Sequence, residues 1–451
     1  MTNNHLEETL QKKIPLSKLS RGRVAGKAML KIGVVSGKGA VKRAFLSKEN
    51  KVLSKSETHA QIAKVLMDSL GELKGVSVKI AQQIALGLPF LPKEYLEEIS
   101  KSFNAIPPIN KALIRKIIKQ ELGDYPQSLF DTFESNAFGA ASLGQVHKAT
   151  LNKKVLAVKV QYPGIASSIV SDLSVINFGL KRFAKGQNVD HLMQELEERL
   201  SEEVDYVLEA ENTNYYAEEL THELIVIPRV VESLSTKSIL TSTFLEGQSF
   251  DAFLKSNPTQ AVRNHYAQLI FDSFFMGLYQ LKMIHADPNP GNFIFMAKKK
   301  LGMIDFGCVK RVNENFLKDF SKLHVLLMDK ASDEEITQQY VIVEMIDQAE
   351  KEAMLAFYQS VIKPLDRIYI EIFEEKKYDF KQNSDFSRRG FNTIMEVQKK
   401  QRHAVHKMNA DYLFIDRTLL GYYNMFEKME ATIDTRFAQQ LVREGMYHEN
   451  D

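Results

Sequence analysis

The spacing of apolar side chains divides the N-terminal half of the chain into two kinds of predicted structure. Over residues 56–130, apolar positions such as Ile62 and Val65 recur at helical spacing. Over residues 137–162 the pattern changes to two short runs rich in β-branched residues, separated by a polar break at residues 152–154, which predicts two strands joined by a turn. A helical segment is therefore expected to precede a strand pair.

The remainder of the chain is predicted to be mostly helical. Helical spacing covers residues 172–212, and residues 223–245 contain two further strand candidates. From Phe250 onward the pattern is helical, interrupted by a hairpin-like region at residues 292–309. Near the C-terminus, aromatic and methionine side chains are expected to lie in the core, namely Tyr422, Tyr423, Met425 and Phe426. Strands in the middle of a largely helical chain predict an α+β fold.

The composition excludes several classes of protein. The 451 residues are 44% apolar and 26% charged, which is ordinary for a globular protein. Lys and Arg total 59 against 57 Asp and Glu, a net charge of +2, so no broad basic field points to a nucleic acid partner. The single cysteine, Cys308, excludes an internal disulfide framework and a cysteine-based zinc site.

Membrane-spanning and secretory segments are not expected either. The start of the chain lacks the apolar core of a signal peptide and does not resemble a transit peptide. The most apolar stretch, Tyr266–Ile284, contains Asp272 and Lys282 and falls short of the ~18 apolar residues of a membrane span. It is predicted to be a buried helix, and the protein is expected to be cytoplasmic.

Local charge near the N-terminus is less even. From Lys12 to Lys48 the chain has eleven cations and no Asp or Glu, interleaved with apolar residues such as Leu30 and Val34. Such a segment suits the surface of an anionic lipid membrane, which would place the protein peripherally on the inner face of a membrane. A solvated arm or the basic face of a packed helix is the alternative, and several glycines are expected to interrupt a long helix here.

Four residues form an ordered set with a common chemistry. Lys159 ends a Leu-Ala-Val-Lys strand, Asp287 follows His285-Ala286 and precedes Asn292 by five residues, and Asp305 begins an Asp-Phe-Gly turn. This is the pattern of a protein kinase, in which the lysine pairs with ATP phosphates. We expect Asp287 to orient or deprotonate the acceptor, and Asn292 and Asp305 to hold Mg²⁺ through oxygen atoms.

The surrounding motifs resemble the UbiB/aarF family of atypical kinase-like proteins. That family has A-A-A-S-I-G-Q-V-H where this chain has Gly139–His147, and its V-A-V-K-V-Q-Y-P-G is nearly reproduced at Leu156–Gly164. Its H-A-D-P-x-P-G-N is found at His285–Asn292. The resemblance implies a bilobal protein-kinase-like fold in three parts. A basic segment and helical extension would occupy residues 1–130, the N-lobe 131–245, and the C-lobe with extra C-terminal helices 246–451.

The resemblance also implies a nucleotide site. In this family an alanine-rich loop replaces the glycine-rich loop of kinases, and a helix glutamate, here Glu209, pairs with Lys159. A hinge that contacts adenine through its backbone is expected at residues 242–245. The nucleotide-contacting residues implied besides Lys159 are therefore Ala140, Ala141, Ser142, Gln145, Thr243 and Leu245.

A further implied feature is a regulatory extension. The family motif K-x-G-Q is matched by Lys79 and Gln82, with alanine in place of the glycine, and E-x-D is matched by Glu203 and Asp205. The two acids are implied to meet Lys79 and Gln82. If residues 172–212 form one helix, Glu203 and Glu209 lie on different faces of it and serve different partners.

The resemblance implies an ATP- and Mg²⁺-dependent atypical kinase or ATPase that supports ubiquinone (isoprenoid quinone) biosynthesis or lipid homeostasis at a membrane. Quinone-biosynthesis proteins or lipid precursors are possible partners. Two alternatives stay open. One is a kinase that phosphorylates a protein or small molecule in trans, and the other is a pseudokinase scaffold that binds nucleotide without turnover.

Overall fold

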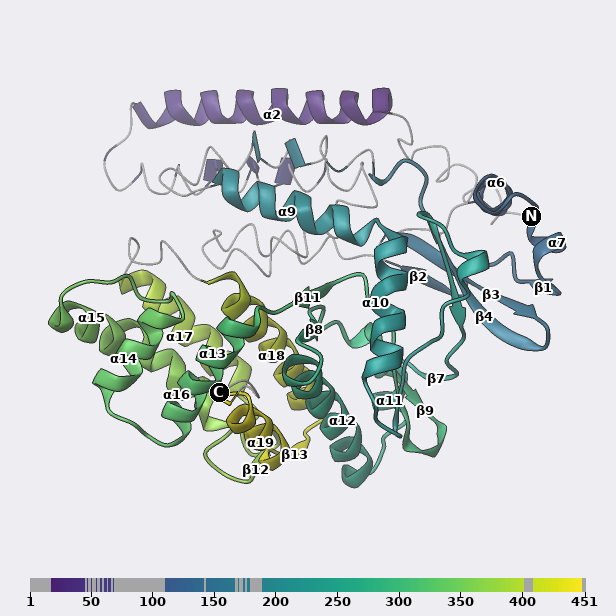
Figure 1. Cartoon of the computed structure of the whole chain (residues 1–451). Coiled ribbons are helices and arrows are strands. Elements are labelled where there is room, and N and C mark those ends of the chain that lie inside the picture. Colours follow the sequence, from purple (N-terminus) through teal and green to yellow (C-terminus); the bar gives the residue numbers. More distant parts are fainter. Residues whose placement is uncertain are drawn as a thin grey trace. The chain divides into compact units, whose positions relative to one another are not determined.

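The computed structural model describes residues 18–44, 110–141, 143–166, 189–400 and 409–447, together with isolated positions between 47 and 68 and between 169 and 178 (Figure 1). The chain divides into two compact units. The first unit comprises residues 1–211 and 230–244, and the second comprises residues 212–229 and 245–451. Each unit has its own hydrophobic core.

The first unit contains an antiparallel sheet in the order β1-β3-β4-β6, with β2 paired to β3. Its long hairpin joins β3 and β4 through Asn152 and Lys153, whose φ values are 51° and 64°. Two such residues make the tight turn that matches the twist of a hairpin. The predicted strand pair is therefore confirmed. The strands are β1 (Thr132–Phe133), β2 (Gly139–Ala141), β3 (Gly144–Leu151), β4 (Lys154–Gln161) and β6 (Ile239–Thr243).

Alternation along β4 sets the two faces of this sheet. Leu156, Val158 and Val160 are buried in the core of the unit, so Lys159 projects from the opposite face. The helical elements of the first unit are α2 (Lys18–Ala44), α6 (Lys111–Leu122), α7 (Pro126–Leu129), α9 (Val189–Glu203), the first residues of α10 (Tyr206–Glu219) and the short 3₁₀ turn η2 (Glu232–Leu234).

Helix α2 corrects one prediction. Its glycines were expected to interrupt a long helix, yet Lys18–Ala44 is a continuous helix of 27 residues. Ala25, Ala28 and Ile32 are buried, and packing of an apolar face outweighs weak intrinsic propensity. One glycine is required by this packing, because a Cβ on Gly39 would lie 2.4 Å from Oγ1 of Thr58.

The segment around the E-x-D motif corrects a second prediction. A single helix was expected over residues 172–212, but α9 ends at Glu203 and α10 begins at Tyr206. Oδ1 of Asp205 accepts a hydrogen bond from the backbone N–H of Val207 at 3.1 Å, as expected of a residue that caps a helix N-terminus. Glu203 and Glu209 therefore belong to separate helices, and the prediction that they lie on two faces of one helix was wrong.

The second unit is dominated by helices, as predicted. The helices are α11 (Phe250–Lys255), α12 (Gln260–Tyr279), α13 (Glu314–Met328), α14 (Asp333–Ile342), α15 (Lys351–Phe357), α16 (Lys363–Glu371), α17 (Phe386–Lys400), α18 (Ala410–Lys428) and α19 (Arg436–Glu444). A π-helical turn, η5 (Tyr358–Ile362), joins α15 to α16. It precedes Pro364, which has no N–H to donate to the preceding turn.

Short strands complete the second unit. A sheet has the order β5-β10-β9-β7, and two strand pairs join β8 to β11 and β12 to β13. The expected hairpin at residues 292–309 is confirmed by β9 and β10, but the candidate strand that begins at residue 223 is only two residues long and ends before Pro228. The strands are β5 (Ile225–Val226), β7 (Gly247–Gln248), β8 (Met283–His285), β9 (Phe293–Met296), β10 (Leu301–Met303), β11 (Val309–Arg311), β12 (Lys377–Asp379) and β13 (Thr432–Asp434).

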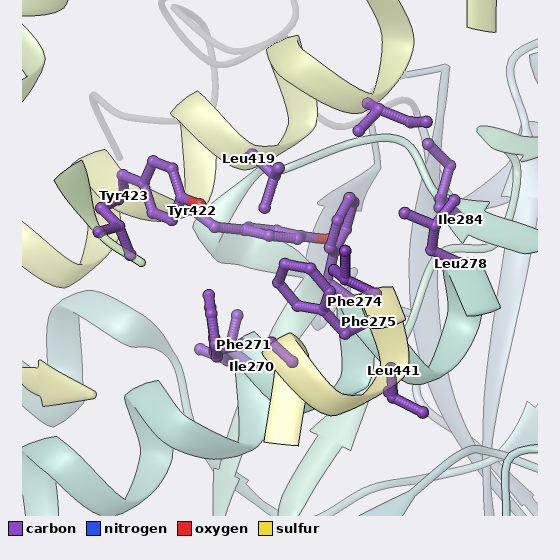
Figure 2. Close-up of a cluster of buried hydrophobic side chains, with 14 of the residues drawn as sticks. Ile270, Phe271, Phe274, Phe275, Leu278, Ile284, Leu419, Tyr422, Tyr423 and Leu441 are labelled. Atoms are coloured by element: carbon purple, nitrogen blue, oxygen red, sulfur yellow. The ribbon is translucent and has the colours of Figure 1, made fainter. Parts of the chain in front are cut away.

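Helix α12 runs through the core of the second unit. Twelve of its residues are buried, on all sides of the helix, which is typical of a central helix. Figure 2 shows its aromatic side chains packed with residues of α18 and α19, including Phe274, Tyr422 and Leu441. The buried-helix prediction is confirmed, and among the described residues no helix is both long and apolar enough to cross a bilayer.

Candidate functional site

In the first unit, Lys159 and Glu209 form an ion pair. Nζ of Lys159 on β4 lies 2.7 and 2.8 Å from the two carboxylate oxygens of Glu209 on α10. The side chains are 14% and 3% exposed, so the pair is largely shielded from water. The contact implied by the family resemblance is present, and it holds a lysine ammonium at a fixed position on the face of the sheet opposite the core.

Tyr206 adds a second contact to this lysine. The ring centroid of Tyr206 lies 4.9 Å from Nζ of Lys159, within the range of a cation–π interaction. Tyr206 is the first residue of α10 and follows the capping residue Asp205. The cap therefore fixes the start of the helix that supplies both the ring and Glu209. Sequence reasoning missed Tyr206, although its place beside the E-x-D motif was a usable signal.

The alanine-rich loop lies at the turn between β2 and β3. Ala140 and Ala141 belong to β2, and Ser142 lies outside the described residues. Gly144 begins β3, where a Cβ would come within 2.4 Å of the carbonyl oxygen of Val160. Only glycine fits this close approach of two strands.

Gln145, the next residue, is buried and oriented by His147. Nε2 of Gln145 lies 2.8 Å from Nε2 of His147, and Nδ1 of His147 lies 2.8 Å from the carbonyl oxygen of Glu134. A carbonyl only accepts, so Nδ1 carries the proton and Nε2 accepts from the Gln145 amide. Burial lowers the pKa of His147, which keeps the ring neutral and able to accept.

The expected hinge spans the boundary between the two units. Thr243 is the last residue of β6 and pairs with Leu156, and the N–H of Phe244 donates to the carbonyl oxygen of Val155 at 3.0 Å. Leu245 is the first residue of the 245–451 segment of the second unit. The backbone thus follows the sheet edge as far as Phe244.

The regulatory extension lies largely outside the described residues, since neither Lys79 nor Gln82 is described. Glu203 is the last residue of α9. Asp205 caps α10 and its Oδ2 lies 3.3 Å from Nζ of Lys237. The expected meeting of these acids with Lys79 and Gln82 stays a prediction.

In the second unit, main-chain hydrogen bonds hold the loop that carries Asp287 and Asn292. The N–H of Ala286 donates to the carbonyl oxygen of Cys308, and the N–H of Ile304 donates to that of Asn292, both at 2.9 Å. Nδ2 of Asn292 donates to the carbonyl oxygen of Asp287 at 3.1 Å. The loop, hereafter the 285–292 loop, is therefore tied to the strands that flank Asp305.

Asp305 is held in an unusual backbone conformation. Its φ is +62°, a left-handed value that few residues other than glycine adopt. Nε2 of His285 lies 2.8 Å from the carbonyl oxygen of Asp305 and 3.2 Å from that of Ile304, so the ring donates to this turn. His285 thus links the 285–292 loop to Asp305.

Phe306 is fully buried beneath this turn. Its carbonyl oxygen accepts from Nδ2 of Asn212 at 3.2 Å, and its ring lies 4.8 Å from that of Tyr216 and 5.2 Å from that of His285. The hydroxyl of Tyr216 donates to the carbonyl oxygen of Met283 at 2.7 Å. Sequence reasoning missed Asn212 and Tyr216, which lie one helical turn apart and support the Asp-Phe-Gly turn.

Asn292 and Asp305 carry the kinds of oxygen that would suit a magnesium ion, which would need further ligands from phosphate and water. Asn292 is buried, and its side-chain NH₂ donates to the carbonyl oxygen of Asp287. Its amide oxygen is the atom that could serve a metal ion, because an amide nitrogen does not act as a metal ligand. Carboxylate and amide oxygens suit Mg²⁺, which is usually bound through one or two carboxylates with substrate phosphates. Within the described ranges, no group of three or more His, Cys, Asp and Glu side chains is arranged to hold a metal ion by itself.

Curated proteins with similar sequences carry kinase names. A probable serine/threonine-protein kinase, abkA of Dictyostelium discoideum, is 30% identical over 279 residues, which cover 58% of this chain and 49% of that protein. The mitochondrial atypical kinase COQ8 of Schizosaccharomyces pombe is 29% identical over 327 residues, which cover 69% and 52%. The chain spans about half the length of these relatives.

Among solved structures, the complex of Rv3197 and erythromycin from Mycobacterium tuberculosis matches with a TM-score of 0.60 at 24% identity, covering 89% of this chain and 100% of that one. This similarity establishes the fold. A sequence profile of the ABC1 atypical kinase-like domain matches residues 101–340, more than half of the chain, and includes Lys159, Glu209, Asp287, Asn292 and Asp305. The α+β kinase-like fold is thus confirmed, and the chain belongs to the ABC1 atypical kinase-like family, the group that includes the UbiB, AarF and COQ8 proteins.

Proposed function

We propose that this protein binds ATP with Mg²⁺ and cleaves its γ-phosphate, as an atypical kinase or ATPase. The observation that carries the proposal is the shielded ion pair between Lys159 and Glu209. Burial of a lysine and a carboxylate together costs desolvation free energy that their attraction need not recover. A pair that is kept despite this cost is therefore a candidate for a functional role. Pairing with nucleotide phosphates is the use that this arrangement serves in kinase folds.

The remaining site residues have distinct roles in the proposal. Asp287 orients the hydroxyl or water that attacks the γ-phosphate and accepts its proton. Asn292 and Asp305 would hold Mg²⁺, which neutralises charge on the phosphate oxygens when bound. His285 fixes the backbone on which Asp305 sits, through the 2.8 Å hydrogen bond to its carbonyl oxygen.

Nucleotide recognition is proposed for the loop and the hinge. Ala140, Ala141 and Ser142 would present backbone N–H groups to phosphate, while His147 sets the direction of the Gln145 amide. Backbone groups at Thr243 and Leu245 would contact adenine. The loop and the hinge would thereby recognise the nucleotide.

The proposed process is isoprenoid quinone biosynthesis or lipid homeostasis, on the basis of family membership. Quinone-biosynthesis proteins or lipid precursors would be the partners. Lys79 and Gln82, with Glu203 and Asp205, would cover the place where a protein substrate docks in other kinases. This favours ATP hydrolysis coupled to assembly over phosphorylation of a protein in trans.

A membrane surface is the proposed place of action. On α2, Leu30, Val34 and Val41 are 72%, 55% and 64% exposed, while lysines such as Lys27 and Lys31 are exposed on the same helix. Exposed apolar residues among cations, with no acid between Lys12 and Lys48, suit anionic lipid. We propose that this helix face lies on the cytoplasmic leaflet.

The nucleotide proposal is tested with the full chain by titration of ATP with and without Mg²⁺, followed by measurement of phosphate release. Tight binding is expected only with Mg²⁺, and Asp305→Asn is expected to lose it. The matched control is Asp347→Asn, because Asp347 is an exposed residue of the same unit. ATP binding by Asp305→Asn that is as tight as that of the wild type with Mg²⁺, or tight binding by this variant without metal, would remove the role given to Asp305.

ATP labelled at the γ-phosphate separates the open alternatives. Label released as inorganic phosphate supports an ATPase, while label retained on added protein or lipid identifies transfer in trans. Binding without either product identifies a scaffold. Quinone intermediates extracted from a deletion strain, with complementation by wild type and Asp305→Asn, test the proposed process. Unchanged quinones in the deletion strain would contradict it.

The membrane proposal is tested by co-sedimentation with liposomes that contain phosphatidylglycerol or cardiolipin. Lys27→Gln combined with Lys31→Gln should weaken binding, and salt should weaken binding of the wild type, since the Debye length falls from ~10 Å at 0.1 M to ~3 Å at 1 M. The control is Lys111→Gln with Lys116→Gln, two exposed lysines of α6. Equal losses in both pairs would mean that α2 is not the membrane-binding face.

A further inference from the structure

Helix α18 contacts the 285–292 loop although it lies beyond the segment matched by the family profile, which ends at residue 340. The hydroxyl of Tyr422 donates to the carbonyl oxygen of His285 at 3.1 Å. Tyr422 is 2% exposed, and its ring centroid lies 5.8 Å from that of Phe293, the residue after Asn292, and 5.9 Å from that of Phe274 (Figure 2). Tyr422 therefore contacts the first residue of the loop and the residue that directly follows the loop.

The preceding residue of α18 makes a second contact. A Cβ on Gly421 would lie 2.3 Å from Cγ and 2.5 Å from Cβ of Pro288, the residue after Asp287. Atoms do not approach that closely, and the proline ring cannot rotate away. The backbone of α18 thus packs directly against the loop, and the absence of a side chain at position 421 permits it.

The start of α18 holds the strand that follows Asp305. Asp411 forms an ion pair with Lys310, in which Nζ lies 3.0 Å from Oδ1, and it accepts a hydrogen bond from the N–H of Asn313 at 3.2 Å. Lys310 belongs to β11, which pairs with β8, the strand that ends at His285. One helix therefore contacts the 285–292 loop and also the segment that follows the Asp-Phe-Gly turn.

These contacts reach Asp305 through one residue. Tyr422 fixes the main chain of His285, and Nε2 of His285 donates to the carbonyl oxygen of Asp305 at 2.8 Å. A change in the position of His285 would move the backbone of Asp305, whose left-handed conformation depends on its surroundings.

We propose that α18 is a positioning element of the reaction centre, in which Tyr422 and Gly421 set the position of the loop that carries Asp287 and, through His285, that of Asp305. The importance of this position for activity rests on the proposed function. The contact of α18 with the loop does not rest on the proposed function, because it is given by the distances between their atoms.

Comparison with Tyr423 shows that core packing alone does not explain the hydrogen bond of Tyr422 to the loop. Tyr423 is 1% exposed, and its ring lies 5.5 Å from Phe386 and 5.9 Å from Phe380, away from the loop. Burial of both residues was predicted from the sequence, and only Tyr422 directs its hydroxyl to a carbonyl oxygen of the loop. The two residues form a matched pair on one helix.

The test compares Tyr422→Phe with Tyr423→Phe in the full chain, by hydrogen exchange of the backbone over residues 283–296 and by Mg-ATP turnover. Loss of one buried hydrogen bond should raise exchange in this segment and lower kcat about tenfold, with little change in KM for ATP, in Tyr422→Phe. Tyr423→Phe should leave both within about twofold. Equal exchange of the segment in the two variants would overturn the inference.

A second pair of variants tests the backbone contact. Gly421→Ala should raise exchange in the segment and lower turnover, because its Cβ would meet Pro288. Gly390→Ala on α17 is the control, since its Cβ would lie 3.6 Å from Cγ2 of Ile368, an ordinary contact. If exchange rises as expected but the wild type has no Mg-ATP turnover, the positioning contact is upheld and the proposed function fails.

Discussion

The two units hold their charged groups by different means. In the first unit, Lys159 is fixed by a side chain 50 residues away, the carboxylate of Glu209. In the second unit, Asp287 and Asn292 lie on a loop that is tied by main-chain hydrogen bonds and packed against buried aromatic residues. The first arrangement depends on one charge and the second on the shape of the core, so different substitutions should disable them.

The largest effect is expected from Glu209→Gln, which leaves the Lys159 ammonium without its carboxylate. Removal of one partner of a buried ion pair costs about 3–5 kcal/mol. ATP affinity should fall by roughly a hundredfold or more, and the melting temperature should also fall. Isothermal titration with Mg-ATP and thermal unfolding measure the two effects.

The control for this prediction is Glu211→Gln, an exposed glutamate on the same helix. It should leave ATP affinity and melting unchanged. Comparable losses in the two variants would mean that the net charge of α10, rather than the ion pair, supports nucleotide binding.

In the second unit, a cavity in the apolar core should reduce activity, whereas in the first unit the loss of a charge does so. Ile284→Ala removes a fully buried side chain directly before His285, which should cost about 2–5 kcal/mol. Leu441→Ala on α19, in the same cluster (Figure 2), should cost a similar amount. At a temperature where both variants are folded, only Ile284→Ala should lose Mg-ATP turnover. Equal turnover would show that the core does not position the loop.

A pH dependence of stability is expected from Asp366, a buried acid of α16 that has no role in the proposed reaction. Burial raises its pKa to about 7, although hydrogen bonds from Tyr340 and Tyr358 oppose the rise. The folded chain then binds a proton that the unfolded chain releases at about pH 4, so the contribution of Asp366 to stability is fully present below about pH 4 and is lost as pH rises to about 7. The fall should be on the order of a few kcal/mol at most.

Asp366→Asn should remove this fall, because the amide does not titrate. Thermal unfolding of both proteins from pH 5 to pH 8 measures it. A wild-type melting temperature that rises steadily with pH, with the same slope in Asp366→Asn, would contradict the assignment.

The smallest effect is expected at Asp205. Two substitutions there distinguish its role as the cap of α10 from the role of its negative charge. Asp205→Ala should cost about 1 kcal/mol through loss of the α10 cap, and Asp205→Asn should keep that stability. Lys237→Ala should cost less than about 0.5 kcal/mol, because its partner contact is exposed. If Asp205→Asn loses ATP turnover while it keeps its melting temperature, the charge serves the proposed extension contact.

Local features of the fold were predictable from the sequence. The β3–β4 hairpin followed from two β-branched runs and a polar turn, and α12 followed from an apolar stretch too polar for a membrane. Prediction of the ion pair between Lys159 and Glu209 required the family resemblance, because an acidic residue on a helix usually faces solvent. Spacing alone did not select Glu209 from its neighbours.

Other features depend on contacts that spacing does not encode. The helical spacing of residues 172–212 predicts that Asp205 lies within a helix, whereas in the structure Asp205 caps the start of α10. An aspartate is compatible with both positions, so its identity alone does not decide between them. The glycines of α2 were expected to break a helix that tertiary packing preserves. The hydrogen bond from Tyr422 to His285 joins residues 137 positions apart, and nothing in the sequence around Tyr422 distinguishes it from Tyr423.

The single cysteine of the chain gives the molecule a native labelling position. Cys308 is partly exposed, and its carbonyl oxygen accepts from the N–H of Ala286 within the hydrogen-bonded frame of the 285–292 loop. Because the sequence contains no other thiol, a maleimide fluorophore or a nitroxide would attach at one position without any background mutation. The spectroscopic signal would then report on the Asp-Phe-Gly turn in an otherwise unaltered protein.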